Sequence, residues 1–508
     1  MVRARVRLGA SLDWKHVAAT FLLSVVIFAT LLLAAFAMIE KLPRPAGTLS
    51  PGPGAEVRRL AEPQTQPAPA VVRSALILPA QNKLHLVAKG ESLAGIVHDY
   101  LPLTSFMTGG ELERAIRSAN PAIKGNWPRP GTGIVIPCYR ENWTEKPVRI
   151  AKDFEVRAVY LTGAMAGSAK GLEIIREWRE AGGNSVVFDM KDSDGSVSVA
   201  TGLPLAPEQR SYPIRNLAKF TGFLHSQGMH AIVRIAIFRD EMLVARHPEL
   251  AVQSRRNGGA WRENGKLVWT DPSNPEIWEY DIGLAKFAAA HGADEIQFDY
   301  VRFPAEGEQK DARFLFESQH PDWTRAGVIT KFLEQAQAGL KPSGVLFSLD
   351  VFGVMAWERP ADLAHTGQDI AQMAKYCDVI SPMIYPSHFF GMDGYSSPGD
   401  APEHFIAESM QRFQKVTAES RVVLRPWLQA FGWKTRSYSA EYIRIQVAVA
   451  RANGGDGFLF WNANNDYSKP YSAMAEMRQD KAKYFRGDEV ASFAEKAQAT
   501  ENKGAAAN

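Results

Sequence analysis

Eight short apolar runs recur along the chain between residues 158 and 462, and stretches with the apolar spacing of a helix separate them. The runs are AVYLT (158–162), SVVFDM (185–190), HAIVRIAIF (230–238), DEIQFD (294–299), VLFSLD (345–350), VISPMIY (379–385), RVVLRPWLQ (421–429) and GFLFWN (457–462). Strands that alternate with helices predict a parallel sheet covered by helices. Eight such units predict an α/β fold, a (β/α)8 TIM barrel, which we place at residues 150–485. An open doubly wound sheet is the alternative, but no glycine-rich nucleotide-binding turn follows the first run.

Polar side chains collect near the ends of these predicted strands. Because neighbouring residues of a strand point to opposite faces, the alternation of polar and apolar residues assigns the polar set to the barrel interior. This inward set is Thr162, Asp189, Arg234, Gln297, Asp299, Ser348, Asp350, Tyr385, Arg425, Trp427, Gln429 and Asn462. Buried carboxylates and guanidinium groups are costly unless they are paired or used, and TIM-barrel active sites lie at the C-terminal strand ends. The accumulation therefore predicts an active site there.

Charge and motif content exclude several other kinds of chemistry. The 58 Lys and Arg residues nearly balance the 55 Asp and Glu residues, so the chain lacks the basic field that nucleic-acid binding needs. No histidine cluster suits zinc, and no serine nucleophile elbow is present. The string DMKDSDG (189–195) lacks the spacing and the terminal Glu of a calcium loop. We therefore predict no metal, no cofactor and no nucleic-acid partner.

The two cysteines of the chain, Cys138 and Cys377, match neither a zinc site nor a redox pair. Cys377 stands just before a predicted strand, where a free cysteine is usually a small buried apolar residue. Whether the two form a disulfide stays open.

Residues 17–39 form an uncharged apolar run that is long enough to span a bilayer as a helix. Three arginines and Lys15 precede the run, and the positive-inside bias then places residues 1–16 in the cytoplasm and the rest of the chain outside. We therefore predict a single-pass anchor in the inner membrane, with the folded domains on the periplasmic, or extracytoplasmic, side. A secreted form that is cleaved near Ala37 is the alternative.

Two further segments have compositions that do not form a packed core. Residues 40–83 are rich in Pro, Ala and Gly without strand or helix periodicity, which predicts an extended linker between the membrane and the folded domains. Residues 486–508 are rich in Ala, Lys, Glu and Asn and are predicted to be a disordered tail.

A small module is predicted at residues 84–137, which open with LHLVAKGESL, continue through ELERAIRSANP and close with RPGTGIVIP. The pattern resembles a lysin-motif (LysM) module with a βααβ fold. The matching residues are Val87, Gly90, Glu91, Ser92, Leu93, Asn120, Pro121, Gly131, Ile134, Ile136 and Pro137. The resemblance implies binding to peptidoglycan or another N-acetylglucosamine-containing polymer. Residues 99–110 are longer than the usual connection between the two helices, and a purely structural βααβ cap on the barrel is the alternative.

The barrel sequence itself carries a second resemblance, which begins with DEIQFDYVRFP at residues 294–304. This segment is similar to a family of glycosidase-like barrels, a glycosyl hydrolase domain of unknown function within the TIM-barrel glycosidase superfamily. The other matching segments are YLTGAMAG (160–167), VVFDMKDSDGSV (186–197), SLDVFG (348–353), DVISPMIYPSHF (378–389), RPWLQAF (425–431) and GFLFWNANNDY (457–467). The resemblance covers most of residues 156–470 and implies sugar chemistry on a TIM barrel, without naming a substrate.

Hydrolysis of a glycosidic bond needs two carboxyl groups that flank the bond. Asp299 and Asp350 end neighbouring predicted strands, whose backbones would lie about 4.8 Å apart, so their carboxyl groups suit the short separation of a retaining enzyme. Similarity to barrel glycosidases with a nucleophile at the end of strand four implies that Asp299 is the nucleophile. Asp350 is then the candidate acid/base, and Asp189 is its rival. Arg234 and Arg302 are predicted to hold a nearby carboxylate ionised.

Polar and aromatic residues at the same strand ends complete the predicted site. The candidate substrate-binding residues are Arg234, Gln297, Arg302, Tyr385, Trp427, Gln429, Trp461 and Asn462. Aromatic rings can pack against sugars, although core filling explains each ring equally well. The sequence as a whole predicts a glycoside hydrolase that acts on an envelope or extracellular polysaccharide. A non-catalytic carbohydrate-binding envelope scaffold on a degenerate barrel is the alternative, and two neighbouring inward carboxylates argue against it.

Overall fold

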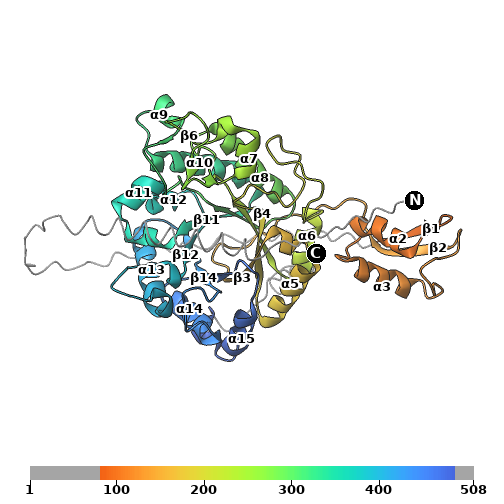
Figure 1. The fold of residues 1–508 in the computed structure, drawn as a ribbon. Coiled ribbons are helices and arrows are strands. Elements are labelled where there is room, and N and C mark those ends of the chain that lie inside the picture. Colours follow the sequence, from red (N-terminus) through yellow and green to blue (C-terminus); the bar gives the residue numbers. More distant parts are fainter. Residues whose placement is uncertain (1–80, 487–508) are drawn as a thin grey trace, which may run out of the picture. The chain divides into compact units, whose positions relative to one another are not determined.

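The computed structural model describes residues 81–486 (Figure 1). The predicted cytoplasmic tail, the membrane anchor, nearly all of the linker and the C-terminal tail from residue 487 lie outside the described residues. Between residues 81 and 486, no helix has both the length and the apolar character that crossing a bilayer requires. The described chain comprises a main unit, residues 81–388 and 399–486, and a loop of residues 389–398 with turns of its own.

Eight parallel strands form the centre of the main unit. They are β3 (Val156–Leu161), β4 (Ser185–Lys191), β5 (His230–Ala236), β9 (Glu295–Asp299), β11 (Leu346–Phe352), β12 (Val379–Ile384), the interrupted pair β13 (Val423–Leu424) and β14 (Trp427–Gln429), and β15 (Gly457–Trp461). Each strand pairs with the next in this order, β15 pairs with β3, and the pairing of β11 with β12 completes the ring. The eight predicted strands and the predicted barrel are therefore confirmed, and the open-sheet alternative is wrong because the sheet closes.

The predicted strand at residues 421–429 is in fact broken into β13 and β14. The break falls at Arg425 and Pro426, and proline has no backbone N–H to donate to a neighbouring strand. Both pieces pair with β12 in one register, Val423 with Val379 and Trp427 with Met383. The interruption therefore changes the hydrogen bonding and leaves the alternation of inward and outward side chains intact.

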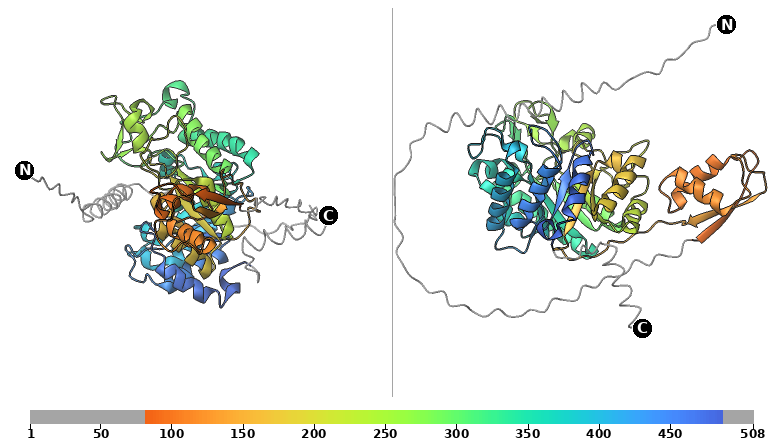
Figure 2. Two further views of the ribbon diagram at one scale, coloured as in Figure 1. Left: turned by 90° about the vertical axis from the view of Figure 1, so that its right-hand side faces the viewer. Right: turned by 90° about the horizontal axis from the view of Figure 1, so that it is seen from below.

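Helices follow the strands and lie on their outer side (Figure 1, Figure 2). Around the barrel these are α4 (Gly163–Ala166), α5 (Ala169–Ala181), α6 (Leu217–Ser226), α7 (Glu241–Arg246), α8 (Pro275–Ala290), α9 (Phe316–Gln319), α10 (Arg325–Leu340), α11 (Pro360–Thr366), α12 (Ile370–Met373), α13 (Pro402–Val416), α14 (Ala440–Ala452), α15 (Ser468–Met477) and α16 (Lys481–Tyr484). Short hairpin strands β6 (Gln253–Ser254), β7 (Arg262–Glu263), β8 (Leu267–Val268) and β10 (Ala312–Arg313) lie in the long loops after β5 and β9.

Helix α5 shows how local sequence sets these elements. Ser168 accepts a hydrogen bond from the backbone N–H of Gly171 at the start of the helix, as an N-cap does. Leu172, Ile175 and Trp178 recur on one face and are buried. Gly182 ends the helix with φ of 104°, a left-handed conformation that glycine adopts without a steric penalty. Helix α5 therefore occupies the stretch between the first two predicted strands, where the apolar spacing predicts a helix.

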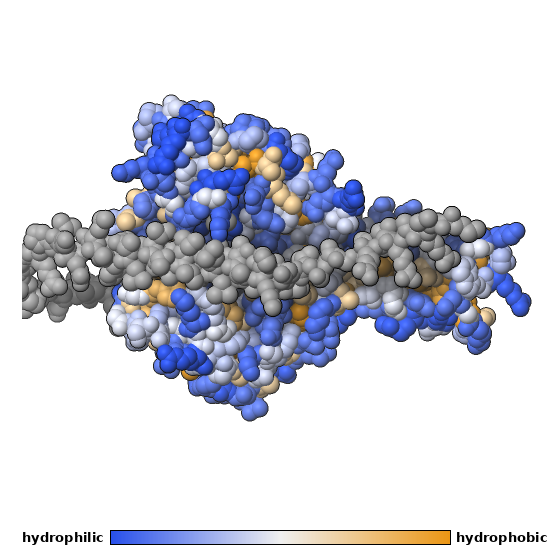
Figure 3. Space-filling model, in the orientation of Figure 1, coloured by the Kyte–Doolittle hydropathy of each residue, from blue (hydrophilic) through white to orange (hydrophobic). Residues whose placement is uncertain are grey.

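The barrel is filled mainly by apolar side chains in its middle. Ala158, Val187, Ile232 and Leu459 belong to one buried cluster, to which Tyr160, Tyr385 and Trp427 also belong. Burial of apolar area of this kind is the main force that stabilises the fold. The surface seen in Figure 3 is mostly hydrophilic, with small apolar areas.

Residues 81–139 form a βααβ unit. Strand β1 (Gln81–Leu86) pairs antiparallel with β2 (Gly133–Tyr139), and α2 (Leu93–Tyr100) and α3 (Gly109–Ala119) connect them. The amide of Asn120 donates to the carbonyl of Val135 at 2.8 Å and accepts from its N–H at 2.9 Å, which ties the end of α3 to β2. Buried Ile96, Ile116, Ile134 and Ile136 belong to its own apolar core. The order of elements thus matches the predicted βααβ pattern.

Both cysteines are free thiols, so they do not form a disulfide. Cys377 is buried just before β12, as its position in the sequence predicts. Burial raises the pKa of its thiol, which keeps this residue protonated and unreactive.

Candidate active site

The C-terminal ends of β4, β5, β9 and β11 bring four charged side chains together inside the barrel. Asp189 on β4 is in register with Arg234 on β5, and Arg234 is in register with Gln297 on β9. Asp299 ends β9, and Asp350 lies near the end of the neighbouring strand β11. The strand alternation therefore predicts these inward positions correctly.

Arg234 lies at the centre of this group. Its Nη1 is 2.5 Å from Asp189 Oδ1, and its Nη2 is 2.5 Å from Asp299 Oδ2. Its Nε donates to Asp299 Oδ2 at 3.1 Å and lies 3.8 Å from Asp350 Oδ2. One guanidinium thus faces three buried carboxyl groups. A single positive charge cannot compensate three negative ones in a medium of low dielectric, so the arrangement favours a proton on at least one carboxyl group.

Asp350 is the carboxyl group most favoured to keep a proton. Its side chain is buried, and Trp427 donates its indole N–H to Oδ1 at 2.7 Å. Burial and the negative charge of Asp299 raise the pKa of Asp350 well above its usual range, although Arg234 and Trp427 act in the opposite direction. A carboxyl group that stays protonated near neutral pH can act as a general acid.

Asp299 is held by donors on both of its oxygens. Oδ2 accepts from Arg234, and Oδ1 accepts from the backbone N–H of Tyr300 at 2.6 Å. Tyr300 has φ of 56°, a left-handed conformation that is unusual for a residue other than glycine. Backbone strain of this kind collects at functional sites, where surrounding contacts hold it in place. The same residue donates its backbone N–H to Asp299.

Asp189 is buried more deeply than Asp299. It accepts from the hydroxyl of Tyr160 and from Arg234. Burial raises the pKa of Asp189 to about 7, against the attraction of Arg234. Both oxygens of Asp189 accept hydrogen bonds from protein donors. These contacts indicate that Asp189 orients Arg234.

Tyr160 is a site residue that the sequence did not single out, although it lies in the first predicted strand. It has the same strand parity as the inward Thr162, and its hydroxyl reaches Asp189. The alternation of inward and outward side chains along the strand is the sequence signal that could have identified Tyr160. A tyrosine in an apolar strand is otherwise indistinguishable from a core residue.

Aromatic rings collect at the ends of β12 and β15 and in the loop after β14. Trp461 at the end of β15 stacks on Tyr385 with ring centres 5.6 Å apart and meets Phe431 edge-on at 5.3 Å. Trp461 is partly exposed, whereas Tyr385 is buried. His388 packs against Phe431, and burial lowers the pKa of His388 to about 4, so this ring is neutral at neutral pH. The predicted aromatic residues are thus brought together, and Phe431 and His388 join them.

Three predicted substrate-binding amides have protein partners. Gln297 donates to Ser381 Oγ at 3.2 Å from a fully buried position. Gln429 accepts from the N–H of Ser387 at 3.1 Å and donates to Thr435 Oγ1 at 2.9 Å. Asn462 Nδ2 donates to the carbonyl of Ala430 at 2.6 Å and to that of Asp466 at 3.0 Å. The contacts of Gln429 and Asn462 hold loops that follow the strands, whereas that of Gln297 joins β9 to β12.

Other members of the predicted inward set lie outside the carboxyl group cluster. Thr162 caps helix α4 through its hydroxyl. Arg425 donates to both oxygens of Glu295, at 3.0 and 2.8 Å, and Glu295 starts β9 at the opposite end of the strand from Asp299. Ser348 donates to the carbonyl of Ile296. Arg425 therefore serves a structural ion pair beneath the site.

Arg302 does not lie within ion-pair distance of Asp299, unlike Arg234. Its guanidinium stacks on Trp269 at 4.6 Å and on Phe352 at 4.5 Å, and it donates to the carbonyl of Phe303. Of the two arginines expected beside this carboxylate, only Arg234 forms an ion pair with it. Nowhere in residues 81–486 do three or more His, Cys, Asp or Glu side chains gather as metal ligands would.

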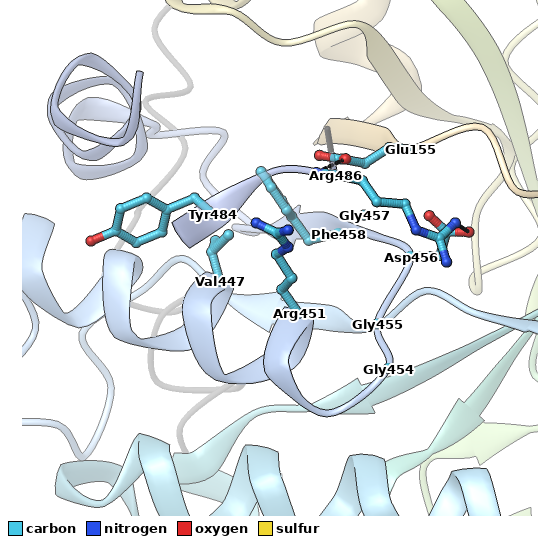
Figure 4. Close-up of a pocket in the computed structure, with 10 residues that line it drawn as sticks. All are labelled: Glu155, Val447, Arg451, Gly454, Gly455, Asp456, Gly457, Phe458, Tyr484 and Arg486. Carbon is cyan, nitrogen blue, oxygen red and sulfur yellow. Dashed lines mark hydrogen bonds and ion pairs between the residues drawn. The ribbon is translucent and has the colours of Figure 1, made fainter. Parts of the chain in front are cut away.

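A different pocket lies near the N-terminal end of β15, as Figure 4 shows. Its lining includes Glu155, Arg451, Asp456 and Arg486, and Arg486 forms an ion pair with Asp456 at 2.8 Å. None of the predicted site residues lines this pocket. It is therefore separate from the carboxyl group cluster at the C-terminal strand ends.

Parts of this chain are similar to several proteins of known structure. A hypothetical protein from Ruminiclostridium thermocellum is 36% identical over 38% of this chain and 97% of its own, with a TM-score of 0.34. The glycoside hydrolase domain of PgaB (BpsB) from Bordetella bronchiseptica is 14% identical over 63% of this chain and 99% of its own, with a TM-score of 0.47. The spore cortex-lytic enzyme SleL of Bacillus megaterium is 12% identical over 79% of this chain and 86% of its own, with a TM-score of 0.39. No curated protein matches the sequence significantly.

The family model described as "Putative glycosyl hydrolase domain" matches residues 158–467. The match runs from β3 to the turn after β15, so it includes every barrel strand and all four charged residues of the site. The chain belongs to this family, and its barrel is a glycosyl hydrolase domain.

Proposed function

We propose that the barrel cleaves glycosidic bonds with net retention, using Asp299 as the nucleophile and Asp350 as the acid/base. One observation carries this proposal: Arg234 binds Asp299 directly, while the neighbouring Asp350 has a strongly raised pKa. A pair of carboxyl groups with environments this different is what glycosidic hydrolysis needs, one ionised and one protonated.

The spacing of the two groups supports the same mechanism. Arg234 Nε is 3.1 Å from Asp299 Oδ2 and 3.8 Å from Asp350 Oδ2, so these two oxygens are at most about 7 Å apart. Retaining enzymes have carboxyl groups about 5 to 5.5 Å apart and inverting enzymes about 6.5 to 9.5 Å, so this upper bound fits retention and leaves only the short end of the inverting range. Asp299 would attack the anomeric carbon while Asp350 gives its proton to the leaving oxygen. Asp350, now ionised, would then take a proton from the water that releases the sugar from Asp299.

We propose a polysaccharide of the cell envelope or matrix as the substrate. Trp461 contacts Phe431 and also Tyr160, whose hydroxyl donates to Asp189, and such aromatic rings can pack against sugar faces. The direct experiment incubates the full chain with a panel of aryl glycosides and envelope polysaccharides and measures the release of phenol or of new reducing ends. Release of product with retained anomeric configuration is expected. Binding of glycans without any cleavage would instead favour the carbohydrate-binding scaffold.

We propose that residues 81–139 are a LysM-like module that binds N-acetylglucosamine-containing polymers. The βααβ order, the KGESL turn and the Asn120 contact to β2 support this assignment. Within the turn, Glu91 accepts from the N–H of Ala88 at 2.8 Å and contacts His85, so the turn is well ordered. Trp127, in the loop before β2, is 71% exposed and available to a ligand.

We propose that the chain is held in the inner membrane by residues 17–39, with the module and the barrel on the extracytoplasmic side. The support is the span-length apolar run and the positive residues before it. A secreted form that is cleaved near Ala37 is the alternative.

A further inference from the structure

Two arginines flank Tyr300 at the C-terminal end of β9, directly after the proposed nucleophile. Arg302 lies with its guanidinium carbon 5.5 Å from the centre of the Tyr300 ring, and that of Arg239 lies 5.4 Å from the same ring. Arg302 also stacks on Phe352, which ends strand β11 two residues after Asp350. Both cations therefore lie beside the residue that follows the proposed nucleophile, and Arg302 also reaches the end of the strand that carries Asp350.

Within residues 81–486, no carboxylate oxygen lies within 4.0 Å of a guanidinium nitrogen of either arginine. Arg239 donates to the hydroxyls of Tyr300 at 2.9 Å and Ser193 at 3.4 Å, which are neutral acceptors. Arg302 donates to the carbonyl of Phe303. An arginine has five N–H donors, so most of the donors of Arg302 have no acceptor in this part of the chain.

The carboxylate that most affects the pKa of Arg302 belongs to Glu263, which accepts hydrogen bonds from other donors. Glu263 is buried, and it accepts from the indole N–H of Trp269 at 2.9 Å and from two backbone N–H groups, those of Ala305 and Glu306. Burial lowers the pKa of Arg302, against the attraction of Glu263. Arg302 is therefore a partly exposed cation without an ion-pair partner among the described residues, so its free N–H donors can reach an anionic ligand.

We propose that Arg302 and Arg239 form a subsite for an anionic group on the sugar substrate, a carboxylate or a sulfate. This inference deepens the proposed function and rests on it for the position of the catalytic pair. A guanidinium that stacks on aromatic rings presents its edge donors in one plane, and a planar fork binds the two oxygens of an oxyanion together. The substrate class is thus an acidic polysaccharide, with uronic acid or sulfated residues.

The test measures binding of short oligosaccharides to the full chain by titration calorimetry at low salt. The anionic probes are tetrasaccharides of galacturonate, mannuronate and chondroitin sulfate, and cellotetraose is the neutral probe. We expect at least one anionic probe to bind about tenfold more tightly than cellotetraose, and this preference to shrink as salt rises. The uronate and sulfate probes then separate the two anion types.

Three variants assign the preference to the subsite. Arg302→Met keeps an unbranched stem over the aromatic rings and removes the charge, so the anion preference should be lost; Arg239→Met should weaken it. Arg302→Lys keeps the charge and should retain part of the preference, which guards against misfolding of the Met variant. The matched control is Arg325→Met, because Arg325 also stacks on two rings, Phe303 and Phe314, but donates to Gln309 and to the carbonyl of His365.

An anion preference that survives in Arg302→Met, or the lack of tighter binding by every anionic probe, would overturn the subsite. Binding does not depend on turnover, so the two proposals fail separately. Anion-selective binding without cleavage of any glycoside would reject the hydrolase and keep the subsite. Cleavage of neutral glycosides without any anion preference would keep the hydrolase and reject the subsite.

Discussion

The indole N–H of Trp427 donates a hydrogen bond of 2.7 Å to Oδ1 of Asp350. Trp427 is on β14 and Asp350 is on β11, and strand β12 lies between these two strands. This bond stabilises the ionised form of the carboxyl group and so opposes the effects of burial and of Asp299 on its pKa. Trp427 is therefore expected to set how far the pKa of the proposed acid rises.

Trp427→Phe should shift the basic limb of the kcat/KM profile to higher pH. The phenyl ring keeps most of the packing but cannot donate, so the pKa of Asp350 should rise further. Activity falls as pH rises through the pKa of a general acid, so a higher pKa moves that limb upward. Trp461→Phe is the matched control, since no hydrogen bond joins Trp461 to Asp350 in the described chain. An unmoved limb in Trp427→Phe would contradict this role.

Glu295→Gln should lower the free energy of unfolding by about 3 to 5 kcal/mol, because it leaves the fully buried Arg425 without its anionic partner. Denaturant unfolding monitored by circular dichroism measures this loss. Glu173→Gln is the control, since its ion pair with Lys170 on α5 is exposed and should contribute nothing measurable. Equal stability of Glu295→Gln and the unmodified chain would show that the buried pair is not stabilising.

The buried ion pair of Glu295 with Arg425 also predicts that the stability of the fold depends on pH. Burial would raise the pKa of Glu295, but Arg425 and His230 more than offset it and lower the value to about 2. A lowered pKa contributes stability that is present above the unfolded value of about 4.5 and is lost as pH falls from there through 2. The difference in stability between the unmodified chain and Glu295→Gln should therefore shrink across that interval. A difference that stays constant down to pH 2 would contradict the lowered pKa.

The barrel was predictable from the sequence because each strand carries its own signal. Alternation within DEIQFD and VLFSLD placed Asp299 and Asp350 inside, and the structure puts them on neighbouring strands. Contacts across the barrel were not predictable in this way. Arg425 was placed inward but its partner Glu295 was missed, since the two are 130 residues apart and meet only once all eight strands are in register. Arg302 was expected to pair with a carboxylate, and its position depends instead on the turn at Tyr300.

The βααβ module should bind insoluble peptidoglycan or chitin when residues 81–139 are expressed alone. Its own buried core and its Asn120 contacts support independent folding, which proton NMR dispersion would check first. Trp127→Ala should weaken the binding, because this ring is exposed next to β2, whereas Met242→Ala in the full chain, an exposed apolar residue of the barrel, should not. A folded module that stays in the supernatant would identify it as a structural cap.

Washed membranes should retain the full-length chain if residues 17–39 stay in place as an anchor. The measurement is fractionation of cells that express the protein, followed by N-terminal sequencing of the mature form. A soluble form that begins near Met38 would show that the apolar run is removed as a signal peptide.

The comparison of Asp299→Asn with Asp350→Asn distinguishes a nucleophile from an acid, because only the loss of an acid depends on the leaving group. Both substitutions keep the shape of the side chain, and melting temperatures would establish that both variants fold. Asp311→Asn, in the loop before β10, is the control and should keep full activity. The measurement is kcat/KM on aryl glycosides whose leaving groups span a range of acidity.

Asp299→Asn should lose several orders of magnitude in kcat/KM on every substrate, because the attacking carboxylate is gone. Asp350→Asn should lose much less on substrates with acidic leaving groups, which need little protonation to depart, and far more on those with basic ones. Such a split in leaving-group dependence is the predicted result. Full activity of Asp299→Asn, or the same loss in Asp350→Asn for every leaving group, would contradict the assignment.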